Sequence, residues 1–140
     1  VLDFAVDLVE PERVIAVGFS IGTGIAASLA GRRPLDGLIL VTPFDSLKAV
    51  AGDIYPWLPV GLMFQHELNT VAFLDGSDVP TAIIAAERDE IIPESRTAAL
   101  RAVVPNLVFD RTIPRAGHND IYGRSDFQDA MHAALAAFGG

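Results

Sequence analysis

The sequence predicts an α/β fold in which a parallel sheet of about four strands is covered by helices. Four short runs of apolar and β-branched residues are typical of buried strands, and segments of helical character separate them. Strands that alternate with helices pair in parallel through right-handed crossovers. The length of 140 residues suits one domain, residues 1–140, and 51% hydrophobic residues are enough to bury a sizeable core.

The first half of the chain contains two of the predicted strands. Residues 2–9 have apolar side chains at helical spacing, and Pro11 ends this short helix. The nearly continuous apolar run at 13–19 predicts a strand buried on both faces. A helix rich in small residues is expected at 21–32, followed by a second buried strand at 35–41.

The second half begins with a segment at about 45–78 that is expected to form a small helical insert. A third buried strand is predicted at 81–86, and the helix at 93–104 begins with a proline and a glutamate, which favour a helix start. Residues 107–113 alternate in polarity and indicate an outer strand. The apolar stripe of 125–138 predicts the last helix.

Composition and charge exclude several function classes. The net charge of −8 repels phosphate backbones, so no nucleic-acid partner is expected. The absence of cysteine excludes disulfides, thiolate metal sites and a cysteine nucleophile. No apolar run approaches the roughly 18 residues of a membrane span, and no signal peptide is visible, so a cytoplasmic location is favoured.

A serine, Ser20, directly follows the first predicted strand in the segment AVGFSIGTG, between Gly18 and Gly22. A strand that turns at once into a helix forces an unusual backbone conformation on the turn residue, and side chains two positions before and after it would collide. Glycine is therefore expected to be required at both positions. Such a turn projects the hydroxyl from the sheet edge and indicates a nucleophile, whereas an ordinary strand-to-helix turn is the alternative.

A free serine needs a general base and a carboxylate that orients the base. His118 follows the fourth predicted strand and Asp89 follows the third, so both lie at the same sheet edge as Ser20. His66 lies in the predicted insert and His132 within the last helix, so neither is as well placed. The hypothesis is a catalytic triad in the chain order Ser, Asp, His.

Four segments together resemble the C-terminal half of an α/β-hydrolase: GFSIGTGIAASLA, TPFDSL, ERDEIIP and AGHND. They are similar to segments of the bud-emergence-type serine hydrolases, which are related to the prolyl-oligopeptidase-like group. The resemblance implies that Ser20 is the nucleophile, Asp89 the acid and His118 the base. It also implies that the backbone N–H of Ile21 is one oxyanion-hole donor.

The chain departs from this family in length and in one motif. The family's sheet usually has eight strands, of which only the last four are found here, so the domain is expected to be N-terminally incomplete. The second oxyanion donor normally comes from a His-Gly-Gly or His-Gly-Asn loop, and the sequence contains neither. The expected site has half an oxyanion hole unless another polypeptide supplies the rest.

The predicted function is a serine hydrolase that cleaves a carboxylic ester, thioester or related acyl bond of a small acyl substrate. The reaction needs no cofactor, and no metal site is expected. Because a protonated imidazole cannot accept a proton, the rate is expected to rise with pH as His118 becomes neutral. The alternative is a truncated, weak or inactive hydrolase half that acts as an assembly or binding module.

Other features of the sequence leave alternatives open. Asp45 follows the second predicted strand, where some relatives place the acid, and Glu90 is a further acid next to Asp89. Residues 22–27 fit a loose dinucleotide-binding pattern, with Asp45 about 20 residues further on. The apolar stretch 56–64 either lines an acyl pocket or packs the insert onto the core.

The strand at 13–19 predicts a partner. Without a further neighbour it is an edge strand with unpaired N–H and C=O groups, and no charge or proline within its apolar run protects it. We expect two copies to pair through this strand as a homodimer, with a complementing N-terminal fragment as the alternative partner.

Overall fold

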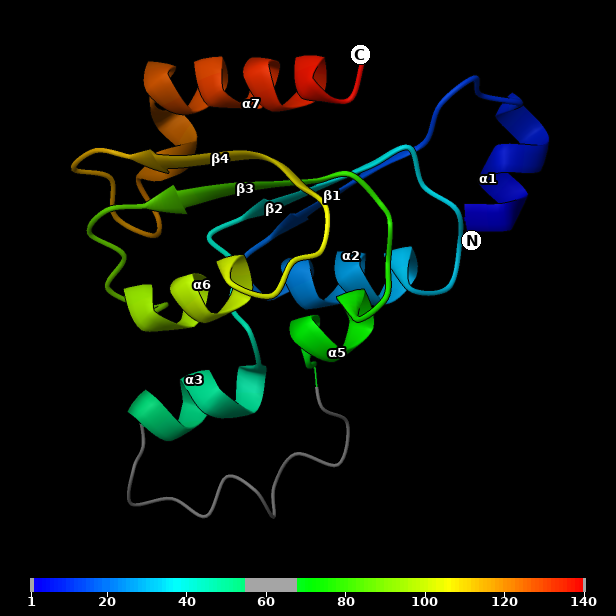
Figure 1. The fold of residues 1–140 in the computed structure, drawn as a ribbon. Coiled ribbons are helices and arrows are strands. Elements are labelled where there is room, and N and C mark those ends of the chain that lie inside the picture. Colours follow the sequence, from blue (N-terminus) through cyan, green and yellow to red (C-terminus); the bar gives the residue numbers. More distant parts are fainter. Residues whose placement is uncertain (1, 55–67, 140) are drawn as a thin grey trace.

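The computed structural model describes residues 2–54 and 68–139, and its four strands form one parallel sheet (Figure 1). The strands are β1 (Ile15–Phe19), β2 (Gly37–Val41), β3 (Thr81–Ala86) and β4 (Leu107–Ile113), paired in that order. All three pairings are parallel. The predicted α/β class and strand number are therefore confirmed.

Helices connect and cover the strands. They are α1 (Leu2–Val9), α2 (Gly22–Ala30), α3 (Leu47–Ile54), α5 (Thr70–Leu74), α6 (Glu94–Arg101) and α7 (Ser125–Ala137), with a 3₁₀ turn at Ile121–Gly123. Helices α3 and α5 lie within the segment predicted as an insert, and the apolar stretch 56–64 lies outside the described residues. Within residues 2–54 and 68–139, no helix combines the length and hydropathy needed to cross a bilayer.

The sheet separates two layers of helices. Helix α7 covers one face, and α2 and α6 cover the other (Figure 1). The two inner strands are buried along their whole length, with alternate residues packed into each layer. For example, Ile39 and Val41 belong to the core under α7, whereas Leu38 and Leu40 belong to the core with α2. This packing fixes the sheet whose carboxyl edge holds the site.

Strand β1 is less buried than the sequence predicts. Its side chains Val17 and Phe19 are 40% and 43% exposed, so burial on both faces is wrong for this strand. The reason is its place in the sheet, because β1 pairs only with β2 among the described residues. Backbone N–H groups of Asp36 and Ser20 donate to the Val14 and Val41 carbonyls, so even-numbered residues of β1 face β2. The odd-numbered N–H and C=O groups therefore face the open edge.

Candidate active site

Ser20 lies on the sharp turn between β1 and α2, in a left-handed backbone conformation with φ of 50°. Residues other than glycine rarely adopt this conformation because it costs energy. It persists only where the surrounding structure holds the residue in place. The Ser20 N–H donates to the Val41 carbonyl at 2.9 Å, and the Thr23 N–H donates to the Ser20 carbonyl at 2.9 Å. The turn is thus fixed to β2 on one side and to the first turn of α2 on the other.

The two glycines around Ser20 have different reasons to be there. A Cβ at Gly18 would lie 2.6 Å from the Gly22 carbonyl oxygen and 2.7 Å from Thr23 Cα. These are backbone atoms that cannot move aside, so glycine is required at position 18. A Cβ at Gly22 would meet nothing within 4 Å. The predicted steric need for Gly22 is therefore wrong, because this first residue of α2 faces open space.

His118 lies between Ser20 and Asp89. Its Nε2 is 2.8 Å from Ser20 Oγ, and its Nδ1 is 2.8 Å and 2.9 Å from the two Asp89 carboxylate oxygens. The His118 and Asp89 side chains are only 5% and 7% exposed. The three residues come from the loops after β1, β3 and β4, whose carboxyl ends meet at one edge of the sheet (Figure 1).

The hydrogen bonds of Asp89 determine the tautomer of the His118 imidazole. Its Oδ1 accepts the backbone N–H groups of Ile91 and Ile92, at 2.9 Å and 2.7 Å, which holds the carboxylate in place. A carboxylate accepts hydrogen bonds, so Nδ1 of a neutral His118 carries the proton. Nε2 then has a lone pair that can accept the Ser20 hydroxyl proton. The arrangement can therefore move a proton from Ser20 to His118.

Glu90 contacts the backbone of His118 instead of its ring. Its Oε2 accepts the His118 N–H at 3.1 Å, and this hydrogen bond lowers the pKa of the Glu90 carboxyl. The sequence suggested Glu90 only as a further acid. A hydrogen bond between a side chain and a distant backbone N–H depends on the shape of two loops, so no sequence pattern points to it. The adjacent acids in ERDE are the one signal that draws attention to this position.

The other candidates lie elsewhere. Asp45 pairs with Arg96 at 3.2 Å, and its Oδ1 accepts the Ser46 N–H at 2.8 Å. The structure places His132 exposed on α7, whereas His66 lies outside the described residues. In residues 2–54 and 68–139, no three His, Asp or Glu side chains gather as metal ligands.

Ile21 follows Ser20 and precedes α2, so its N–H lies at the amino end of that helix.

Two aromatic rings near Ser20 were not anticipated from the sequence. Phe19, the last residue of β1, packs edge-on against Tyr122, with ring centroids 5.7 Å apart. Tyr122 packs in the same way against Phe127 of α7, at 5.9 Å. These contacts join the residue before Ser20 to the segment that follows the His118 loop. The rings therefore form an apolar support beside the site.

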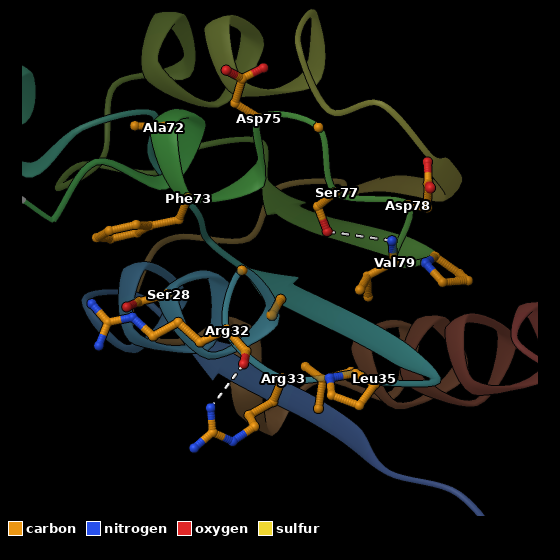
Figure 2. A pocket seen from close by; sticks show the side chains of 15 residues that line it. Ser28, Arg32, Arg33, Leu35, Ala72, Phe73, Asp75, Ser77, Asp78 and Val79 are labelled. Atoms are coloured by element: carbon orange, nitrogen blue, oxygen red, sulfur yellow. Dashed lines mark hydrogen bonds between the residues drawn. The ribbon is translucent and has the colours of Figure 1, made fainter.

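The structure also contains a cavity of about 710 Å³, whose lining residues are drawn in Figure 2. It is lined by the end of α2, the loop after it, helix α5 and the segment between α5 and β3, including Arg32, Phe73, Asp75 and Asp78. The residues that line it lie toward the amino end of β3, opposite the edge that holds His118. It includes none of Ser20, Asp89 or His118, so it is not where a substrate of this site would bind.

Comparison with known sequences finds similar proteins that are much longer. The chain is 32% identical over 112 residues to the uncharacterized protein Rv2307c of Mycobacterium tuberculosis, covering 80% of this chain and 40% of that protein. It is 31% identical over 115 residues to the α/β-hydrolase domain-containing protein aho-3 of Caenorhabditis elegans, covering 81% of this chain and 33% of that protein. The chain thus spans less than half the length of these relatives. No protein-family model matches it.

Solved structures share the fold at low identity. The α/β-hydrolase enzyme MGS-M2, from a Medee basin deep-sea metagenome library, superposes with a TM-score of 0.72 at 16% identity, over 99% of this chain and 70% of that one. MGS-MChE2, an α/β-hydrolase enzyme from lagoon sediments of Mar Chica, gives 0.69 at 22% identity, over 94% and 65%. The esterase domain of a Rhodothermus marinus protein gives 0.67 at 14% identity, over 97% and 63%. The chain therefore has a partial α/β-hydrolase fold.

Proposed function

We propose that the chain is a serine hydrolase that cleaves a carboxylic ester, thioester or related acyl bond through an acyl-enzyme. One observation carries this proposal: His118 lies within hydrogen-bond distance of both the Ser20 hydroxyl and the Asp89 carboxylate, at 2.8 Å to each. A nucleophile, a base and an orienting acid in this order are the parts that acyl transfer requires. The fold shared with α/β-hydrolase enzymes supports the same reaction class.

In the first half of the proposed reaction, Ser20 Oγ attacks the carbonyl carbon while His118 Nε2 takes the hydroxyl proton. Asp89 accepts the Nδ1–H and stabilises the imidazolium that forms. The carbonyl oxygen becomes an oxyanion, to which the Ile21 N–H at the start of α2 donates. His118 then gives its proton to the leaving group, and the carbon–heteroatom bond breaks. The acyl group is now bound to Ser20.

In the second half, water replaces the leaving group. His118 takes a proton from the water, whose oxygen attacks the acyl carbon, and Ser20 leaves with the proton that His118 returns. Apart from water, this proposed cycle uses only the side chains and backbone of the protein and the acyl substrate. The Ile21 N–H is one oxyanion donor, and a site without a second donor would turn over about 10²–10³-fold more slowly.

The proposal is tested by hydrolysis of 4-nitrophenyl acetate, with Ser20→Ala as the matched control. Burst release of nitrophenol followed by slower turnover, absent in Ser20→Ala, supports the acyl-enzyme. Equal rates for the two proteins would favour the alternative, a hydrolase half that works as an assembly or binding module. Run across a range of pH, the same assay checks that the rate rises with pH, as expected for a reaction that needs an unprotonated general base.

Replacing Asp89 with asparagine is expected to lower kcat by about 10⁴-fold. The amide no longer fixes the His118 tautomer whose Nε2 accepts the serine proton. Asp45→Asn is the matched control, because Asp45 pairs with Arg96 and not with His118. We expect this second substitution to leave kcat within about 3-fold of the parent. The ester assay separates the two carboxylates, and a larger loss for Asp45→Asn would assign the acid to position 45.

We also propose that the open edge of β1 binds a second copy of the chain. Val17 and Phe19 are exposed there, and the backbone groups of the odd-numbered residues face outward. No charged residue or proline lies within β1 to prevent strand pairing. Two β1 strands related by a two-fold axis would make one continuous sheet.

Val17→Lys is expected to convert this dimer into a monomer, because a charge on an edge strand opposes pairing with another strand. Sedimentation velocity at micromolar concentration measures the change, with the exposed Val103→Lys, away from β1, as the control. A monomeric parent protein would contradict the homodimer and leave a complementing N-terminal fragment as the partner of β1.

A further inference from the structure

We propose that Glu90 is a positioning residue that fixes the backbone of His118 while Asp89 fixes its ring. The inference rests on the proposed function and extends it to a residue outside the Ser-His-Asp set. Two consecutive carboxylates on the loop after β3 hold opposite ends of the same histidine. Asp89 accepts the ring Nδ1–H at 2.8 Å, and Glu90 accepts the main-chain N–H at 3.1 Å.

The two loops that Glu90 joins are held together at further points. The Arg88 N–H donates to the Ala116 carbonyl at 2.8 Å, and the Glu87 carboxylate accepts the Arg115 N–H at 2.7 Å. Arg115 has a left-handed φ of 58°, so this contact holds a residue in an unfavourable conformation. These contacts fix the base of the His118 loop. In the part of the chain that the structure describes, Glu90 is the residue that accepts the main-chain N–H of His118 itself.

Gly117 shows how closely the Glu90 carboxylate approaches the His118 loop. A Cβ at Gly117 would lie 2.8 Å from Glu90 Oε2 and 3.6 Å from its Cδ. A side chain at 117 would therefore displace the carboxylate from the His118 N–H. The Gly117 N–H donates to Asp120 Oδ1 at 2.7 Å, so the backbone amide before that of His118 is also held by a carboxylate. The absence of a side chain at 117 is what allows the contact.

The charge of Glu90 is suited to accepting the His118 main-chain N–H. The hydrogen bond from the His118 N–H lowers the pKa of the Glu90 carboxyl. A lowered pKa in the folded protein means that the contact favours folding above the ordinary pKa of glutamate. The contribution is lost as the pH falls through the lowered value, well below the range in which histidine titrates. The Glu90 carboxyl is therefore ionised at neutral pH.

The experiment compares Glu90→Ala, Glu90→Gln and, as a matched control, Glu94→Ala, which removes a surface glutamate paired with Arg101. The readouts are kcat and KM for 4-nitrophenyl acetate, the urea midpoint of unfolding, and the downfield proton NMR signal of His118 Nδ1–H. We expect Glu90→Ala to lower kcat by about 10-fold to 10²-fold with KM unchanged, as for a misplaced catalytic group. Glutamine keeps an acceptor oxygen and is expected to restore most of the rate.

Gly117→Ala is a second variant that tests the same contact independently. It is expected to reproduce the loss of Glu90→Ala, and to add little to it in the double variant, because the displaced carboxylate is already absent. Additive losses would show that Gly117 and Glu90 do not act through one contact. Rates and His118 signals for Glu90→Ala that match Glu94→Ala would overturn the proposal, as would a lowered urea midpoint that glutamine does not restore.

The NMR readout separates this proposal from the proposed function. If the parent protein does not hydrolyse the ester, the proposed function fails. A shifted or broadened His118 signal in Glu90→Ala, restored in Glu90→Gln, would still show that Glu90 positions the histidine. An unchanged signal in Glu90→Ala would overturn the positioning role whatever the parent's activity.

Discussion

Replacing either Ser20 or His118 with alanine is expected to lower ester hydrolysis by about 10⁴-fold or more, to near the rate of buffer. Ser20→Ala removes the nucleophilic oxygen. His118→Ala removes the base, whose Nε2 lies 2.8 Å from that oxygen. Because the two groups act as a unit, the double variant is expected to lose no more than either single variant. Steady-state kinetics of the three proteins measure these losses.

His132→Ala is the control for this experiment, since the side chain lies exposed on α7. We expect it to keep the parent rate. Losses that add up in the Ser20, His118 double variant would contradict a shared catalytic step. A large loss in His132→Ala would place the base on the last helix instead of the loop after β4.

Gly18→Ala is expected to destabilise the protein by about 3 kcal/mol, because the new methyl group would collide with the backbone of α2. The distances of 2.6 Å and 2.7 Å to the Gly22 oxygen and Thr23 Cα leave no side chain that could move aside. Gly22→Ala is expected to be neutral or to stabilise by up to about 1 kcal/mol, since alanine favours a helix and meets no atom. Urea unfolding measures both changes.

This pair of variants separates two interpretations of the glycine pattern around Ser20. If glycine is needed at both positions, as the sequence pattern alone suggests, the two alanine variants lose similar stability. If packing decides, only Gly18→Ala loses stability. Equal losses would contradict the geometry of the turn between β1 and α2.

The strands could be predicted from the sequence because each buried strand is a continuous apolar run between turn residues. β3 and β4 occupy the predicted residues, and β2 begins two residues later than predicted. The exposure of Val17 and Phe19 could not be predicted, because an apolar run does not show which neighbours a strand has. Burial depends on the sheet around a strand, and β1 lies at its edge.

The site shows the same limit at the level of single residues. Topology alone places Ser20, Asp89 and His118 at one sheet edge, because parallel strands end on the same side. The sequence already favoured Asp89 over Asp45 as the neighbour of His118 but left Asp45 open, since both acids follow a strand. The coordinates place Asp89 against His118 and Asp45 against Arg96. The contact between Glu90 and the His118 N–H depends on how two loops lie together, which no local pattern records.

The central claim is that Ser20 is the nucleophile, and covalent labelling tests it most directly. A fluorophosphonate forms a bond between its phosphorus and an activated serine oxygen, and fluoride leaves. Peptide mass spectrometry is expected to find the adduct on Ser20, with labelling strongly reduced in His118→Ala and absent in Ser20→Ala. An adduct on another residue, or equal labelling of Ser20→Ala, would contradict the claim.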